Sequence, residues 1–166
     1  MKNKKRGRRS GPVYVYQYSL LDVMMASPVA PLPDSHRVHQ LTRMYGGLHA
    51  IETAPEPTTD DWRVCSDAVN LMETLVEMQV VEDSSGLLMD AVTALALAGK
   101  RHRAGGPIRL DAPGIKAVRA VLEDYAAVLE QVPARTMLQA HRQTEKRIHE
   151  ILQGRKRPHD CEVMDL

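Results

Sequence analysis

The chain has 166 residues, 43% hydrophobic and 26% charged, which is typical of one globular domain. It has no Phe and one Trp, while Met, Leu, Val and Ala are plentiful, a side-chain set that favours helices over sheets. No apolar run reaches the ~18 residues that a membrane-spanning helix needs, and the N-terminus lacks the apolar region of a secretory signal. The two cysteines, Cys65 and Cys161, have no framework spacing. We therefore expect reduced thiols and a cytoplasmic protein without membrane contact.

The net charge of +1 conceals a strong segregation of charge along the chain. Residues 1–9 carry six basic residues and no acidic one. Residues 50–99 hold ten acidic residues against Arg63 alone, and residues 100–157 hold 13 basic residues against six acidic ones. Such asymmetry bears on partners and self-association rather than on the fold.

The first 33 residues show no long helical pattern. Residues 1–12 have the composition of a disordered basic arm and end at a Gly-Pro pair. Residues 13–33 are predicted to be an extended segment and a linker stiffened by Pro28, Pro31 and Pro33, with a short helical turn at residues 20–26. The β-prone run VYVYQY at residues 13–18 either packs on the remainder of the protein or pairs with a copy of itself.

The first full helix is predicted to start at a cap formed by Asp34 or Ser35. Its apolar face is expected to consist of Val38, Leu41, Tyr45 and Leu48, at 3-4-3 spacing. Gly46 and Gly47 interrupt this pattern, which indicates a kink or the close approach of a neighbouring helix.

Two further helices follow Pro55 and Pro57. One is capped by Thr58 or Thr59 and carries a clear apolar stripe at 3-4-3-4 spacing, made of Trp62, Cys65, Val69, Met72 and Val76. The next restarts after residues 83–85 and ends in a basic turn at residues 99–106, with an apolar face of Leu88, Ala91, Leu95 and Ala98.

The last two predicted helices have the strongest boundary signals. Asp111 caps a helix that has Pro113 in its first turn, and this helix carries the best apolar face in the chain: Ile115, Val118, Leu122, Tyr125, Leu129 and Val132. Pro133 separates it from a final helix that runs to about residue 152 and stops at Gly154. Short connections imply antiparallel neighbours. We therefore predict an all-α, up-down bundle of about five helices over residues 34–154, namely four helices with the helix at 34–51 added, and a tail at 155–166.

No constellation of residues indicates catalysis or metal binding. His36 and His39, and His141, Glu145 and His149, have helical spacing but lack further ligands, so we interpret them as solvated or packed side chains. Cys65 lies in an apolar stripe, where its thiol is expected to be buried and unreactive. No nucleophile elbow, phosphate-binding loop or dinucleotide motif occurs in the sequence. We predict a non-enzymatic protein with no cofactor and no metal.

Three basic clusters predict contact with nucleic acid: the N-terminal arm, residues 100–103 and the last helix. On the last helix, 4-3-4-3-4 spacing aligns a stripe of Arg135, Gln139, Arg142, Lys146, His149 and Gln153. The expected phosphate ligands are Lys4, Lys5, Arg6, Arg8, Arg9, Arg101, Arg103, Arg135, Arg142, Lys146, Arg155 and Lys156. The alternative is that this stripe is solvated, or packs against the acidic segment 52–90 of its own chain or of a second copy.

A second hypothesis is that the protein binds a host protein, as an inhibitor or an adaptor. The contact surface would then be an acidic helix face or the tyrosine-rich segment, with Asp60, Asp67, Glu73, Glu77, Tyr14, Tyr16 and Tyr18 as its residues. In either hypothesis we expect a homo-oligomer, because residues 13–18 would otherwise leave an apolar and aromatic edge exposed.

Two short motifs accompany the basic N-terminus: Trp-Arg-x-Cys-x-Asp at residues 62–67, and Ile-Arg-Leu-Asp at residues 108–111, which opens a long helix. In these features the chain resembles small helical proteins of bacterial phages and integrated elements, some of which are labelled Fis-type regulators. The resemblance covers about residues 35–153 and implies transcriptional regulation, or inhibition of a host defence. A Fis-type protein ends in a helix-turn-helix, whereas here Pro133 joins two long helices and no short recognition helix follows.

Overall fold

The computed structural model describes residues 16–154, and within that range it contains six α-helices and no strand. They are α1 (Leu20–Met25), α2 (Asp34–Thr53), α3 (Thr59–Glu77), α4 (Leu88–Arg103), α5 (Ala112–Gln131) and α6 (Ala134–Leu152). The predicted all-α bundle is confirmed, and the predicted short helical turn is α1. The basic arm at residues 1–12 and the tail at 155–166 lie outside the described residues. Within residues 16–154, no helix combines the length and the apolarity needed to cross a membrane.

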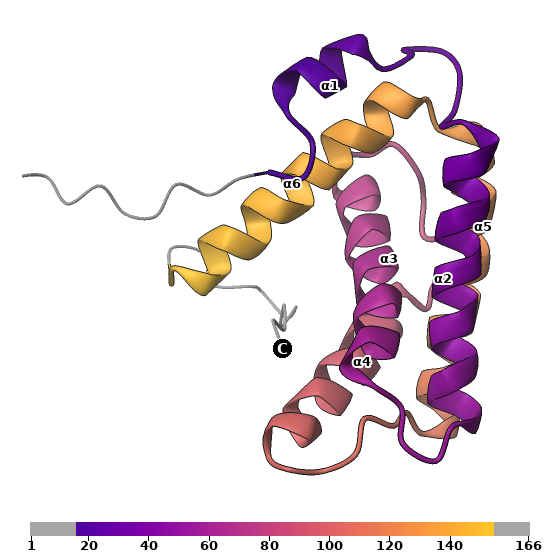
Figure 1. The fold of residues 1–166 in the computed structure, drawn as a ribbon, viewed down its shortest axis with the longest axis vertical. Helices are drawn as coiled ribbons and strands as arrows, with labels where there is room; N and C mark the ends of the chain where they lie inside the picture. Colours follow the sequence, from indigo (N-terminus) through magenta and orange to yellow (C-terminus); the bar gives the residue numbers. More distant parts are fainter. Residues whose placement is uncertain (1–15, 155–166) are drawn as a thin grey trace, which may run out of the picture.

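Helices α2 to α5 pack side by side around one core, and α6 crosses α3 obliquely so that its C-terminal half projects beyond the bundle (Figure 1). α6 packs against α3 and α1, and α1 packs on α6 (Figure 1). The four-helix unit is therefore α2–α5, and the added helix is α6. Our prediction had instead assigned the added position to the helix at residues 34–51. The core includes Leu75, Val118 and Leu122, all fully buried.

The buried face of α2 differs from the predicted one. Val38 is 60% exposed and Tyr45 39% exposed, whereas Met44, Gly47, Leu48 and Ile51 are buried. A Cβ on Gly47 would collide with the Val64 side chain and lie 2.7 Å from the Asp61 carbonyl oxygen. The backbone of α2 thus rests directly on α3 at Gly47, and this contact turns the buried face away from the Val38–Tyr45 side. Asp34 is the first residue of the helix rather than its cap, since Pro33 holds the cap position without a side-chain hydrogen bond.

The other helix starts agree with the sequence. Thr58 caps α3 in a capping box: its Oγ1 accepts from the Asp61 N–H at 3.2 Å, and its own N–H donates to Asp61 at 2.8 Å. Asp111 caps α5 by accepting from the Gly114 N–H at 2.9 Å. The predicted stripe of α3 is buried except for Val76, which is partly buried, and Trp62 donates from Nε1 to the Leu95 carbonyl at 2.9 Å. These local signals therefore position α3 and α5 as predicted.

The end of α4 and the start of α6 differ from the simple local pattern. α4 extends through the basic cluster to Arg103, so residues 99–103 are helical and the turn comes only at Gly105, whose φ is +85°. α6 begins at Ala134, and Pro133 holds its cap position without a side-chain hydrogen bond. Its first N–H groups, those of Ala134 and Arg135, donate instead to the carbonyls of Ala30 at 2.8 Å and Ser27 at 2.9 Å. The loop after α1 therefore takes the place of a cap for α6.

Candidate nucleic-acid interface on α6 and α4

The predicted basic stripe of α6 is partly covered by the chain's own N-terminal segment. Arg135 donates from Nε to the Ala26 carbonyl at 3.2 Å and from Nη2 to the Met24 carbonyl at 2.9 Å. Arg142 donates to the carbonyl of Tyr18, and its guanidinium lies 4.2 Å from the ring centre of Tyr16. These contacts hold residues 16–26 against α6 and occupy some of the donors of both arginines. That either arginine binds phosphate stays a prediction.

Two further α6 side chains complete this contact. Glu145 accepts from the backbone N–H of Gln17 at 3.0 and 3.3 Å, and the ring of His141 meets the edge of the Tyr18 ring at a centroid distance of 5.3 Å. Burial lowers the pKa of His141 to about 4, so the imidazole is neutral at physiological pH. Among the residues that the structure describes, no three His, Cys, Asp or Glu side chains gather as metal ligands would. Tyr16 and Tyr18, two of the predicted partner-binding tyrosines, thus contact α6 from a non-helical segment, and Tyr14 lies outside the described range.

A buried arginine that the sequence analysis did not select joins α6 to α3. The Arg147 guanidinium lies 2.7 Å from a Glu73 carboxylate oxygen and 3.1 Å from one of Glu77, and it donates to the Asn70 carbonyl at 3.2 Å. The side chains of Arg147 and Glu73 are 7% and 8% exposed. A signal was present in the spacing, because Arg147 continues the 3-4-3 spacing of Met137, Ala140 and Thr144 on one face of the helix.

The structure does not bring the predicted acidic residues together on one open face. Glu73 is buried against Arg147, and Glu77 is bound to the same arginine. Asp60 pairs with Arg63 one helical turn away, at 3.2 Å. Asp67 lies in a recess, where desolvation raises the pKa of its carboxyl group against the opposing effect of nearby arginines. The acidic face proposed for a host partner therefore loses Glu73, and its other members are separated by their individual contacts.

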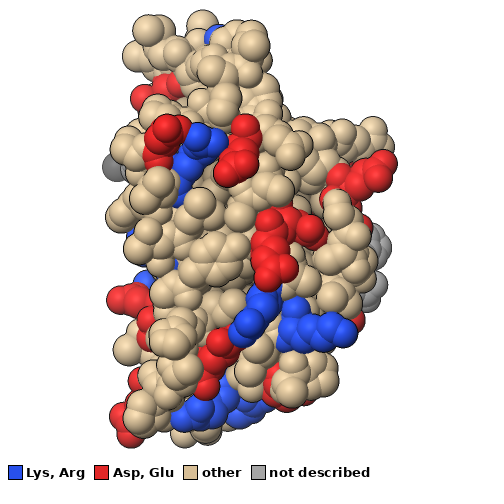
Figure 2. Space-filling model, turned by 90° about the vertical axis from the view of Figure 1, so that its right-hand side faces the viewer, with Lys and Arg blue, Asp and Glu red and all other residues tan. Residues whose placement is uncertain are grey.

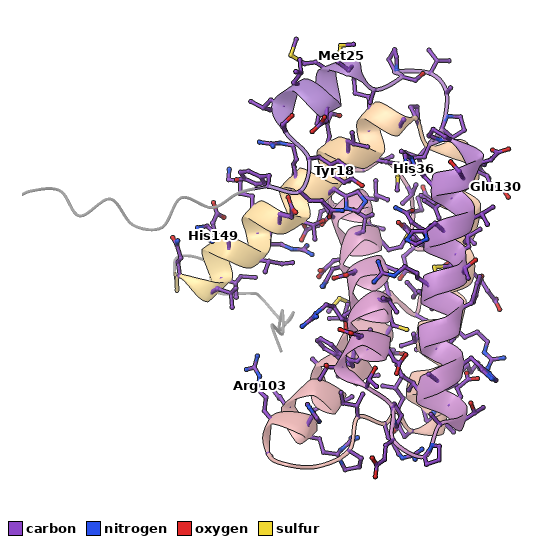
Figure 3. All side chains as sticks on the ribbon, viewed as in Figure 1. Tyr18, Met25, His36, Arg103, Glu130 and His149 are labelled. Carbon is purple, nitrogen blue, oxygen red and sulfur yellow. The ribbon has the colours of Figure 1, made fainter. Side chains whose placement is uncertain are left out.

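α6 and the end of α4 each carry a basic side chain on one shared side of the molecule. Figure 3 shows His149, near the end of α6, and Arg103, at the end of α4, on the same side of the molecule. Between the N-terminal segment and α6 runs a groove of about 460 Å³, and its lining includes Lys146, whose side chain is 64% exposed. Lys146 lies 4.0 Å from Glu150, the limit of an ion pair. Arg101 donates to the Arg109 carbonyl at 2.7 Å.

The opposite side of the molecule has a different charge distribution. Figure 2 shows the face formed by α2 and α5, where basic and acidic side chains alternate over short distances. No patch of a single sign dominates this view, so it offers no extended surface for a polyanion.

Both ends of the described chain lie on α6. Tyr16 rests on Arg142, in the middle of the helix, and Gly154 follows its last turn with a φ of +67°. Leu152, the last helical residue, lies ten residues after Arg142, which corresponds to ~15 Å of helix. In the sequence, the basic residues of positions 1–9 precede Tyr16, and the three basic residues of positions 155–157 follow Gly154. The predicted ligands Lys4, Lys5, Arg6, Arg8, Arg9, Arg155 and Lys156 belong to these segments and lie outside the described residues.

Comparisons with protein-family models, with curated protein sequences and with solved structures give no significant match to this chain.

Proposed function

We propose that this protein is a non-enzymatic regulatory protein that contacts nucleic acid through the side of the molecule where α6 and the end of α4 project. The observation that carries the proposal is that the described chain both begins and ends on α6, so that the sequence continues from one helix toward the six basic residues of positions 1–9 and the three of positions 155–157. Lys146 on α6 and the basic last turn of α4 add cations on that side.

Basic side chains of this kind act by neutralising phosphates and releasing the counterions condensed on the nucleic acid. Such contacts position a protein on the phosphate backbone and carry no base sequence by themselves. Arg135 and Arg142 have a different task in this proposal, because their donors are directed to backbone carbonyls of the N-terminal segment. They stabilise the point at which the basic arm joins α6. The phosphate ligands are then Lys146, Arg101, Arg103 and the basic residues of the two terminal segments.

The test is the fluorescence anisotropy of a labelled ~20-bp DNA duplex titrated with the full chain between ~50 and ~200 mM salt. We expect the affinity to fall steeply with salt. In variants such as Arg8→Ala, Arg155→Ala or Lys146→Ala, the logarithmic salt slope should decrease by about one for each lost phosphate contact. Lys116→Ala is the matched control, since it removes one exposed positive charge on α5 that belongs to none of the three basic clusters.

Two results would overturn the proposal: no binding to DNA or to a single-stranded RNA of the same length at ~50 mM salt, or a loss of affinity in Lys116→Ala equal to that in Lys146→Ala. A host protein that stays bound after nuclease treatment of the lysate would instead favour the inhibitor or adaptor hypothesis. The resemblance to phage and mobile-element proteins remains a prediction.

A further inference from the structure

We propose that α1 and the loop after it form a homodimer interface, in which this apolar surface packs against the same surface of a second copy. The surface is unusual for a short helix, because α1 buries only Val23. Its other large apolar side chains face solvent, with exposed fractions between 66% and 82%, for Leu20, Leu21, Met24, Met25 and Val29. Figure 3 shows Met25 at the outer end of the molecule, pointing away from α6.

Polar contacts fix this orientation. The carbonyls of Met24 and Ala26 accept from Arg135, and the carbonyls of Ser27 and Ala30 accept from the first N–H groups of α6. At the other end of α1, Ser19 and Asp22 form a capping box in which the Ser19 N–H donates to Asp22 at 2.6 Å. The backbone of α1 is thus anchored toward α6, and the apolar side chains are held outward. The surface is arranged in advance of binding, which lowers the entropic cost of association.

The size of the surface points to a macromolecular partner. Each of the five side chains is about two-thirds or more exposed, and all five lie within ten consecutive residues, 20–29. A concentration of exposed apolar side chains of this kind marks an interaction site, and a standard interface takes ~800 Å² from each partner. Exposure of these apolar side chains to water is unfavourable, and packing them against a partner would remove this cost.

The charge of the segment selects a second copy as the occupant. Between residues 16 and 33 the only charged residue is Asp22, and its carboxylate accepts hydrogen bonds from Ser19 within the capping box. A two-fold dimer packs the same surface of both copies together, so a charged residue near the centre of that surface would face the identical charge of the second copy. An uncharged surface of Leu, Met and Val avoids this repulsion, and the flexible methionines can fill gaps between the two copies. Homodimer interfaces are correspondingly the more apolar class.

This dimer does not depend on the proposed nucleic-acid contact. Because α1 packs on α6, however, it would bring two α6 helices into one assembly. A dimer that also binds DNA would then offer each duplex two sets of basic segments.

The test is the mass of the full chain in solution, measured by light scattering after gel filtration at ~1 to ~100 µM protein. We expect twice the 18.5 kDa of one chain at the upper concentrations. The double variant Leu21→Glu/Met25→Glu places two carboxylates, one helical turn apart, on the surface of each copy. Because burying these charges in the interface is costly, the variant should raise the dissociation constant of the dimer at least ~100-fold and yield the monomer. Leu97→Glu is the matched control, since Leu97 is 53% exposed on α4, away from α1, and this variant should remain a dimer.

Circular dichroism melting curves verify that both variants fold, as expected for substitutions at exposed positions. The inference is overturned by a wild-type mass of 18.5 kDa at every concentration, or by a dimer that Leu97→Glu dissociates and Leu21→Glu/Met25→Glu does not. A monomer that sediments with phosphatidylglycerol vesicles, in a manner abolished by Leu21→Glu/Met25→Glu, would also overturn it and assign the surface to lipid.

Discussion

Removal of the Arg147 side chain tests how α6 is held on the bundle. Arg147 makes the buried polar contact between α6 and α3, with Glu73 at 2.7 Å and the Asn70 carbonyl at 3.2 Å. The hydroxyls of Thr74 and Thr144, 2.6 Å apart, share this interface. In Arg147→Ala the carboxylate of Glu73 stays buried and loses the guanidinium 2.7 Å away, while Glu77, 46% exposed, remains in contact with water.

The expected loss is large because of this asymmetry between the two carboxylates. Removing one partner of a buried ion pair costs about 3–5 kcal/mol, chiefly through the charge left uncompensated. We assign this cost to Glu73 alone and expect the free energy of unfolding of Arg147→Ala to fall by about 3–5 kcal/mol. For a domain whose total stability is about 5–15 kcal/mol, the change is a substantial fraction. Replacing both partners, as in Arg147→Met with Glu73→Met, should recover most of the loss, because no buried charge then remains.

Urea denaturation followed by circular dichroism measures the stability, and hydrogen–deuterium exchange shows where it is lost. Since α6 packs against α3 and α1 alone among the described helices, the exchange should accelerate first in α6 and in the α1 segment that α6 carries. Arg119→Ala is the matched control. Its guanidinium pairs with Glu52 at the surface, with its own side chain 52% exposed, so its loss should destabilise the protein much less than the loss of Arg147.

The reasoning is refuted if Arg147→Ala is no more destabilising than Arg119→Ala, or if the double replacement with Glu73→Met is as unstable as Arg147→Ala alone. The first result would mean that the buried charge is compensated elsewhere. The second would mean that lost packing of the long side chain, and not charge, determines the effect.

Two further predictions concern stability. Gly47→Ala should lower the free energy of unfolding by about 1–3 kcal/mol, because its Cβ would collide with Val64 on α3, whereas Gly46→Ala, with open space around it, should raise that free energy by up to about 1 kcal/mol; equal effects in urea denaturation would contradict the packing of α2 on α3. Burial lowers the pKa of His141 from 6.5 to about 4, so the folded protein binds fewer protons than the unfolded chain between these values. Its stability should therefore decline as the pH falls from about 6.5 to about 4, by up to about 3 kcal/mol. His141→Asn should show a shallower decline in denaturation curves at several pH values, and an unchanged decline would place the titration elsewhere.

Most of the fold could be predicted because its signals are local. The Thr58 and Asp111 caps, the prolines between helices and the 3-4 spacing of the α3 and α5 stripes act within a few residues of the backbone they organise. The face of α2 was mispredicted because Gly47, which has no side chain, forms the contact with α3. The spacing of apolar side chains does not reveal a helix contact that is made by the backbone of a glycine.

The candidate site was predicted less well, for a related reason. The 4-3 spacing correctly indicated that the basic residues of α6 share a face, yet spacing alone does not reveal what else lies against that face. Residues 16–26 come back to α6 from more than a hundred positions away and take the donors of Arg135 and Arg142. Arg147 was overlooked because an arginine in a basic helix is expected to be solvated, and its buried partner lies on another helix.

The sequence by itself determined that the chain forms amphipathic helices, where most of them begin and end, and which segments carry opposite charge. Only the tertiary structure decided that α6 leaves the bundle, that two of its arginines hold the N-terminal segment while a third is buried against α3, and that the apolar side of α1 faces outward. The physical reason is the range of the interactions. Caps and helical periodicity depend on residues within one or two turns of each other, whereas burial and the partner of a charge depend on side chains that meet only once the chain has folded.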